Sequence, residues 1–197
     1  MKRYYLLLSL SLIGTFGYAQ NVNNNEIRLG GGFNFDGHPL PLFVKGPSGV
    51  SNGGSVWMEY DHKFTKLPFL YAGLSFDYDT FDLKNSKDKP RMDTYLVGMK
   101  LGVTVSPTSK TEVRFGVEIG NCYMQSRQSF NGYKYRGYGP YSGVELGLTY
   151  YITQNWGIDF SAKSCTIGEH NLVLGDTYTD RLYFTPARVG LGIVYSF

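Results

Sequence analysis

Residues 95–105 read Tyr-Leu-Val-Gly-Met-Lys-Leu-Gly-Val-Thr-Val. Every second side chain of this segment is apolar, from Tyr95 through Val105, and Lys100 and two glycines lie between them. Successive side chains of a β-strand point to opposite faces, so a period of two residues indicates a strand with one apolar and one polar face. The segment is therefore predicted to be a strand that separates an apolar environment from a polar one.

Seven further segments show the same period, at residues 27–36, 56–64, 70–79, 112–120, 143–150, 158–163 and 188–197. Long connections (37–54, 82–92, 125–140 and 169–182) alternate with short ones (65–68, 106–110 and 153–155). The composition, with 17 Tyr, 13 Phe and 25 Gly, also favours strands over helices. The sequence predicts an all-β fold, an eight-stranded antiparallel up-and-down β-barrel with one elaborated end.

The position of the glycines distinguishes between two kinds of barrel. A soluble, lipocalin-like barrel has an apolar interior, whereas a transmembrane barrel has an apolar exterior and a polar lumen. Here the glycines share the face of the charges, as Gly98 and Gly102 do beside Lys100. A solvent-facing surface gains nothing from residues that weaken strands, but the crowded lumen of an eight-stranded barrel needs small ones. The opposite face carries no Lys, Arg, Asp or Glu within the eight segments. A transmembrane barrel is predicted.

The first 19 residues have the pattern of a secretory signal peptide. Lys2 and Arg3 form a basic start, Leu6 to Phe16 is almost wholly apolar, and residues 17–19 read Gly-Tyr-Ala, a small-x-small cleavage site. Cleavage would leave residues 20–197 as one barrel domain. The whole chain has 19 basic and 16 acidic residues, and loss of Lys2 and Arg3 brings them close to balance. A nucleic-acid partner is therefore not expected, because phosphate binding needs a basic excess.

These features together resemble the small outer-membrane β-barrel family of Gram-negative bacteria, of the OmpX, OmpW and OmpA-barrel type. The terminal Tyr195-Ser196-Phe197 resembles the assembly signal of that family. The resemblance implies an integral outer-membrane protein, inserted by the barrel-assembly machinery and surrounded by outer-membrane lipids. It also implies short turns in the periplasm and long loops outside the cell. It brings no catalytic motif with it.

The predicted inner face carries charges of both signs. The basic residues are Arg28, Lys63, Lys100, Arg114, Lys163 and Arg188, and the acidic ones are Asp36, Glu59, Asp61, Asp77, Asp79, Glu112, Glu118, Glu145 and Asp159. Buried charges must be paired and hydrogen-bonded. One interpretation is a salt-bridge network that plugs the lumen, and the other is a selective pore or a proton relay. The narrow lumen of an eight-stranded barrel favours the plug.

The third long connection contains tyrosine, glycine and arginine at residues 125–138. The candidate interaction residues are Arg127, Phe130, Tyr133, Tyr135, Arg136 and Tyr138. This composition is typical of an adaptable recognition surface, here for a surface protein or a glycan. Alternatively, the tyrosines extend the girdle of aromatic rings that marks a membrane surface.

No catalytic, cofactor or metal site is predicted. His38, His62 and His170 lack the neighbouring serine that barrel-type lipid A deacylases use, and no nucleophile and base can be paired. The aspartates that could gather near the long-loop mouth are Asp36, Asp77, Asp79 and Asp82. A hard cation could bind there, but a solvated acidic rim is the simpler interpretation. A strand between Cys122 and Cys165 favours two free thiols, although an oxidising compartment would allow a disulfide.

The predicted function is structural or surface-interacting and not enzymatic, with a plugged lumen and loops that bind a partner. The alternatives are a narrow channel for small solutes, an accessory subunit of a larger outer-membrane complex, and a lipid-modifying enzyme. The channel would need unpaired space in the lumen, and the enzyme would need a nucleophile and a base.

Overall fold

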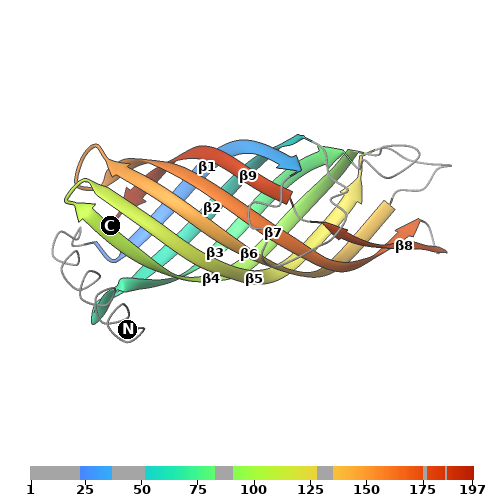
Figure 1. Cartoon of the computed structure of the whole chain (residues 1–197), viewed down its shortest axis with the longest axis horizontal. Helices are drawn as coiled ribbons and strands as arrows, with labels where there is room; N and C mark the ends of the chain where they lie inside the picture. The colour runs from blue at the N-terminus through green and yellow to red at the C-terminus, as the bar shows by residue number, and fades with distance from the viewer. Residues whose placement is uncertain (1–22, 37–51, 83–90, 128–134, 175–176, 185) are drawn as a thin grey trace, which may run out of the picture.

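The computed structural model describes residues 23–36, 52–82, 91–127, 135–174, 177–184 and 186–197 (Figure 1). The strands are β1 (Asn25–Asp36), β2 (Gly53–Phe64), β3 (Leu67–Asp82), β4 (Arg91–Thr108), β5 (Thr111–Ser126), β6 (Tyr135–Tyr151), β7 (Trp156–Leu174), β8 (Thr177–Phe184) and β9 (Pro186–Ser196). The predicted signal peptide, residues 1–19, lies outside the described residues.

The sheet closes because β1 pairs with both β2 and β9. Strand β7 pairs with β9 from Trp156 to Ser164 and with β8 from Ile167 to Leu174. Strands β8 and β9 are thus consecutive halves of one barrel strand, and the fold is the predicted closed eight-stranded antiparallel barrel. Figure 1 shows β8 at the end of the barrel opposite the C-terminus. We call that end the long-loop end, and the end that carries the C-terminus the short-turn end.

Several strands extend further toward the long-loop end than the sequence predicted. Residues 125–140 were expected to be a loop, but β5 continues to Ser126 and β6 begins at Tyr135. The expected loop 169–182 is likewise largely strand, because β7 continues to Leu174 and β8 begins at Thr177. Alternation of apolar and polar residues is needed only where one face meets lipid. A hairpin that extends beyond the membrane keeps its hydrogen bonds without that pattern, and the pattern therefore missed it.

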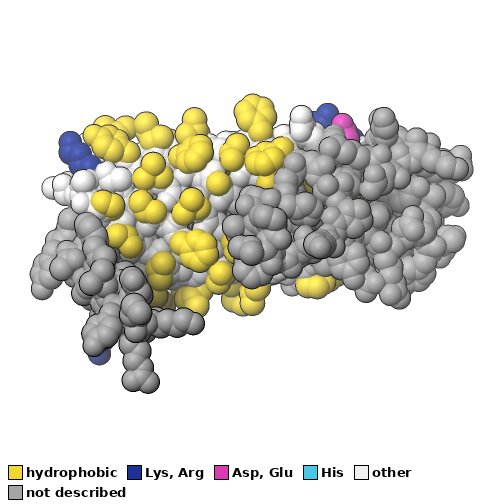
Figure 2. All heavy atoms as spheres, viewed as in Figure 1, with side chains coloured by type: hydrophobic (Ala, Val, Ile, Leu, Met, Phe, Trp, Pro, Cys, Tyr) yellow, Lys and Arg dark blue, Asp and Glu magenta, His cyan; other side chains and the backbone are white. Residues whose placement is uncertain are grey.

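The exterior and the interior of the barrel have the polarity of a membrane protein. Large apolar side chains on the outer wall are exposed, among them Phe33 at 76%, Met99 at 63% and Leu191 at 62%, and Figure 2 shows such side chains around the visible wall. Charged side chains such as Arg28 and Glu26 are fully buried inside. This inversion confirms the predicted assignment of faces. Among the described residues, no helix is long and apolar enough to cross a membrane.

The inward glycines make room for three aromatic rings. A Cβ atom on Gly30 or on Gly190 would lie closer to the nearest atom of the Trp57 indole ring than a real contact allows. The other two rings are related to glycines of β4 and β5 in the same way: Tyr71 lies against Gly102 and Gly116, and Tyr141 lies against Gly98 and Gly120. The glycines of the inner face therefore have a specific steric cause, which is the packing of rings inside a narrow barrel.

The inside of the barrel also contains an apolar layer. Its members are Phe81, Met92, Leu96, Cys122, Met124, Tyr141, Cys165 and Ile167. These residues come from the parts of β3 to β7 that lie toward the long-loop end. Sequence alternation did not predict this layer, because it places apolar side chains on the face that carries charges elsewhere.

Candidate functional site: the lumen network and the long-loop rim

The lumen is filled by a network of buried charges. Within the described part of the chain it comprises six basic and nine acidic side chains, each at most 4% exposed. Its bases are Arg28, Lys63, Lys100, Arg114, Lys163 and Arg188, and its acids are Glu26, Glu59, Asp61, Asp77, Asp79, Glu112, Glu118, Glu145 and Asp159. Every predicted lumen charge whose side chain is described lies inside. The side chain of Asp36 lies outside the described residues.

At the short-turn end the network is centred on Glu26. The ammonium of Lys63 donates to Glu26 Oε1 at 2.6 Å and also to Glu112. The guanidinium of Arg28 pairs with Glu26, and its Nη2 lies 3.4 Å from Glu112 Oε1. The hydroxyl of Tyr151 donates a further hydrogen bond to Glu26. Glu26 was not among the predicted lumen charges because it precedes the first apolar residue of the alternation, but its position two residues before Arg28 puts both on one face.

The middle of the lumen is organised around Arg114. Its Nη2 donates to both carboxylate oxygens of Asp159 at 3.0 Å and lies 3.2 Å from Glu145 Oε1. The ammonium of Lys100 lies 2.9 Å from the other oxygen of Glu145 and donates to Glu59 at 2.6 Å. These bonds join strands that are adjacent or two apart around the barrel, and Arg114 Nη1 also lies 3.4 Å from Asp61 Oδ2 of β2, three strands away.

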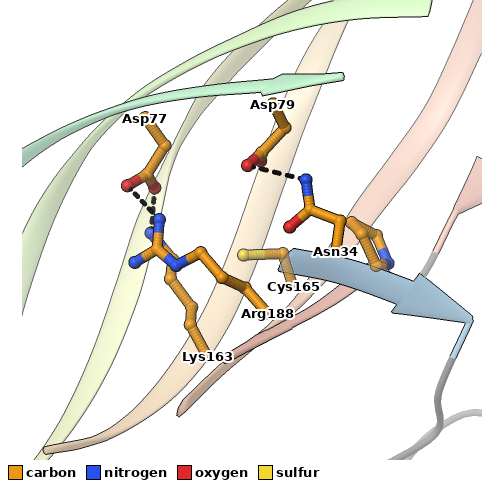
Figure 3. A pocket seen from close by; sticks show the side chains of 7 residues that line it. Asn34, Asp77, Asp79, Lys163, Cys165 and Arg188 are labelled. Atoms are coloured by element: carbon orange, nitrogen blue, oxygen red, sulfur yellow. Dashed lines mark hydrogen bonds and ion pairs between the residues drawn. The ribbon is translucent and has the colours of Figure 1, made fainter. Parts of the chain in front are cut away.

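Toward the long-loop end, Asp77 accepts from two bases. Arg188 Nη1 donates to Asp77 Oδ1 at 2.7 Å and Lys163 donates to the other oxygen, while Asp79 accepts from the amide of Asn34 at 3.0 Å (Figure 3). These groups, together with Cys165, line a cavity of about 10 Å³, roughly the space of one water molecule.

The ion pairs form one continuous chain along the lumen. Asp61 is shared by Arg28, Lys100 and Arg114. Arg188 continues the chain, with Nη2 3.7 Å from Glu59, which Lys100 also contacts. Each base has at least one carboxylate partner, whereas Asp79 accepts a hydrogen bond from the amide of Asn34, so the requirement that buried charges be paired is met for the bases.

Some predictions about polar residues need correction. Asp77 and Asp79 are 0% and 4% exposed and face the lumen, so the interpretation as a solvated acidic rim is wrong for these two residues. Their charges are accommodated by partners across the barrel that sequence proximity does not reveal. Cys122 and Cys165 are buried and form no disulfide, as predicted. No cluster of three His, Cys, Asp or Glu side chains within the described ranges could hold a metal ion.

The residues predicted to form an interaction loop occupy different positions. Phe130 and Tyr133 lie outside the described residues. Arg136 and Tyr138 are exposed on β6 and Arg127 follows the end of β5, whereas Tyr135 belongs to β6 and its side chain is not described. The assignment of Tyr135, Arg136 and Tyr138 to a loop is thus wrong, for the reason given above for the extended strands.

Tyr138 is the last of four tyrosines in register on the outer wall, which we call the tyrosine row. Tyr78 of β3 pairs with Tyr95 of β4, Tyr95 with Tyr123 of β5, and Tyr123 with Tyr138. The ring centroids of Tyr78 and Tyr95 are 5.1 Å apart, and those of Tyr95 and Tyr123 are 6.2 Å apart. At the short-turn end, Trp156, Tyr195 and Phe197 form a second aromatic group. Two aromatic belts are the usual marks of the two membrane surfaces.

Comparison with known proteins identifies the fold. No protein-family model matches the chain, and no curated protein matches it. Among solved structures, Neisserial surface protein A has a TM-score of 0.61 at 14% identity, over 88% of this chain and 97% of that one. The outer membrane protein OprG of Pseudomonas aeruginosa has a TM-score of 0.55 at 13% identity, over 89% and 97%. Ail, the attachment invasion locus protein of Yersinia pestis, in complex with the heparin analogue sucrose octasulfate, has a TM-score of 0.50 at 15% identity, over 88% and 99%.

All three are described as surface, outer-membrane or attachment proteins, and none as an enzyme. At these identities the likeness concerns the fold. In barrels of this kind the short turns face the periplasm and the long loops face the outside. By its fold and its apolar outer wall, the chain is a small, integral outer-membrane β-barrel of eight strands.

Proposed function

We propose that the protein is a barrel with a closed lumen that acts by surface interaction at its long-loop end. The observation that carries the proposal is the burial of six basic and nine acidic side chains inside the described barrel. The charge network is crosslinked from Glu26 near the short turns to Asp77 near the long loops, and the apolar layer lies beyond it. A solute as large as a sugar has no path through such an interior. Function is then left to the exposed end, where connections on a rigid scaffold commonly carry it.

The exposed side chains at the long-loop end support this role. Tyr138 is 65% exposed, and Arg127 and Arg136 are exposed on the neighbouring strands. Tyrosine and arginine are favoured at interaction surfaces because each combines apolar area with hydrogen bonding. Surface protein A and the attachment protein Ail share the fold, and Ail was solved with a sulfated sugar analogue. We therefore propose a surface protein or an anionic glycan as the partner.

The test is a pull-down from native membranes, in which the unaltered protein is compared with variants that lack aromatic residues of the segment 130–138. The variant combines Phe130→Ser, Tyr133→Ser and Tyr135→Ser, and a second variant adds Tyr138→Ser. We expect both variants to insert and to keep the difference in gel migration between boiled and unboiled samples that a closed barrel gives. We also expect them to lose the partner that the unaltered protein recovers.

The matched control is Tyr150→Ser, which removes an exposed tyrosine at the opposite end of the barrel. Retention of the partner by both loop variants, with loss only when other long connections are replaced, would mean that the interaction uses a different loop. Retention after replacement of every long connection would exclude a function carried by the loops.

A second candidate function is a narrow path for small cations. The observation that favours it is the excess of nine carboxylates over six bases inside the described barrel, in one continuous chain. Such an interior attracts cations and repels anions. Planar-bilayer recordings test it: the closed barrel predicts no steady conductance. Small currents whose reversal potential follows the cation gradient would support the path, and openings typical of a general porin would contradict both proposals.

A further inference from the structure

Three exposed arginines share one region of the outer wall at the long-loop end. Arg91 begins β4, Arg127 follows β5 and Arg136 lies on β6. The backbone N–H of Arg127 donates to the carbonyl of Arg91 at 2.8 Å, which places these two side by side. Arg136 pairs with Gln125, two residues before Arg127. Adjacent strands lie only about 4.8 Å apart, so the three residues form a continuous group, which we call the arginine patch.

The arginine patch lies just beyond the tyrosine row. Arg91 and Arg127 are four residues beyond Tyr95 and Tyr123 on their strands, and Arg136 is two residues before Tyr138. With a rise of about 3.4 Å per residue and a strand tilt of about 40°, the patch lies roughly 5–10 Å above the rings. Aromatic belts mark the boundary between acyl chains and headgroups. The patch is therefore at the depth of the lipid headgroups.

One guanidinium of the patch is held in place by its neighbours. Arg127 Nε donates to Asp93 Oδ1 at 2.7 Å, and Arg127 Nη2 donates to the hydroxyl of Tyr78 at 2.9 Å. That hydroxyl in turn donates to Asp93 Oδ1 at 3.0 Å. The Arg127 side chain nevertheless remains 44% exposed. Holding a guanidinium in one orientation lowers the entropy that is lost when it binds an anion.

Among the described residues, the patch also carries positive charge that neighbouring carboxylates do not neutralise. Two acidic residues lie on the same part of the wall, Asp82 and Asp93, against three arginines. Asp93 is already bound to Arg127, whereas Arg91 and Arg136 have no ion pair within the described ranges. Anionic groups outside the protein are the natural partners for these two guanidinium groups, and phosphate matches their geometry.

We propose that the arginine patch binds the phosphate groups of an anionic lipid in the outer leaflet. The wall below the patch supplies the second half of the site, because Val97 and Ile119 are 56% and 60% exposed there and offer an apolar surface to acyl chains. A soluble anion could use only the arginines, whereas a lipid uses both parts. This inference adds one ligand to the proposed surface role. It rests on that role in one respect, namely that the long-loop end is the part of the barrel that binds partners.

The test is a native mass-spectrometry titration of the folded protein in a neutral detergent. The probes are diphosphoryl lipid A and the same lipid after removal of its phosphates. We expect the unaltered protein to bind the phosphorylated probe at least about tenfold more tightly, and the triple variant Arg91→Gln, Arg127→Gln, Arg136→Gln to lose that preference. The matched control is Lys66→Gln, Lys110→Gln, which removes two exposed cations at the short-turn end and should keep the preference.

Two results would overturn the inference. One is a phosphate preference that survives in the triple variant. The other is complete displacement of the lipid by millimolar inorganic phosphate, which would mean that the patch takes free anions. The triple variant keeps every aromatic residue of the pull-down experiment, and the pull-down variants keep all three arginines. Failure of lipid binding and failure of the proposed surface role are therefore distinguishable.

Discussion

The guanidinium of Arg188 stacks on the indole ring of Trp57, with its central carbon 4.1 Å from the ring centroid. The ring also packs against Gly30 and Gly190, so the lumen contains a layer of glycine, aromatic ring and cation. The same order recurs with Lys100 over Tyr71 and Lys163 over Tyr141, each at 5.8 Å. Three bases of the charge network are thus placed by rings that only glycines can accommodate, which couples the steric and the electrostatic filling of the barrel.

Replacing one of these glycines should destabilise the barrel. In Gly30→Val the new Cβ would lie too close to the Trp57 ring, so the ring and the Arg188 guanidinium stacked on it would have to shift, at an expected cost of about 1–3 kcal/mol for overpacking. Gly31→Val is the matched control, because a Cβ there points outward and meets its nearest atom at 3.5 Å. Urea unfolding in lipid vesicles, followed by tryptophan fluorescence, measures the difference. Equal midpoints for the two variants would contradict the steric role of Gly30.

Removing the central base should destabilise the barrel through unpaired carboxylates. Arg114→Met keeps most of the side-chain volume but leaves Asp159 and Glu145 without their guanidinium, at an expected cost of about 3–5 kcal/mol. Lys110→Met, in an exposed turn, should be neutral. The double variant Arg114→Met, Asp159→Asn should recover part of the loss, which a double-mutant cycle in vesicles quantifies. A single variant as stable as the control would show that the network is not needed for stability.

The C-terminal residue should be important for assembly. Phe197 N–H donates to the carbonyl of Asn25 at 2.9 Å, and its ring stacks on Tyr195 with centroids 5.8 Å apart. Deletion of Phe197 removes the last contacts between the first and last strands, so we expect less inserted protein and more degradation. Phe160→Ala, which removes an exposed ring from the middle of the wall, is the control for loss of apolar area. Heat-dependent gel migration of membrane fractions measures both, and equal insertion would refute an assembly signal at Tyr195 and Phe197.

Export should include cleavage after Ala19. The small residues Gly17 and Ala19 fit the site of the signal peptidase, and the mature chain would begin with Gln20. Intact-mass measurement of protein purified from membranes gives the mature N-terminus directly. Ala19→Asp should block the cleavage and leave a heavier product. A mature protein that retains Leu6 to Phe16 would show that this segment is part of the folded protein.

The strands at the long-loop end are where the structure differs most from the sequence-based prediction. Alternation identified Tyr95 as an outward residue, but it ended the strands too early and placed Arg136 and Tyr138 in a loop. The reason is that backbone hydrogen bonds carry a hairpin beyond the membrane without any need for an apolar face. The row of four tyrosines and the arginine patch above it appear only when the registers of β3 to β6 are known.

The sequence by itself determined the strand period, the closed barrel and which face meets lipid. These properties depend on the two-residue repeat, which is local and can be read along one strand at a time. The tertiary structure determined which charges pair. Tyr151 and Glu26 are 125 residues apart, and Lys163 and Asp77 are 86 apart, yet each pair is hydrogen-bonded across the lumen. Strand tilt and register set those distances, and neither is encoded in the alternation of a single strand.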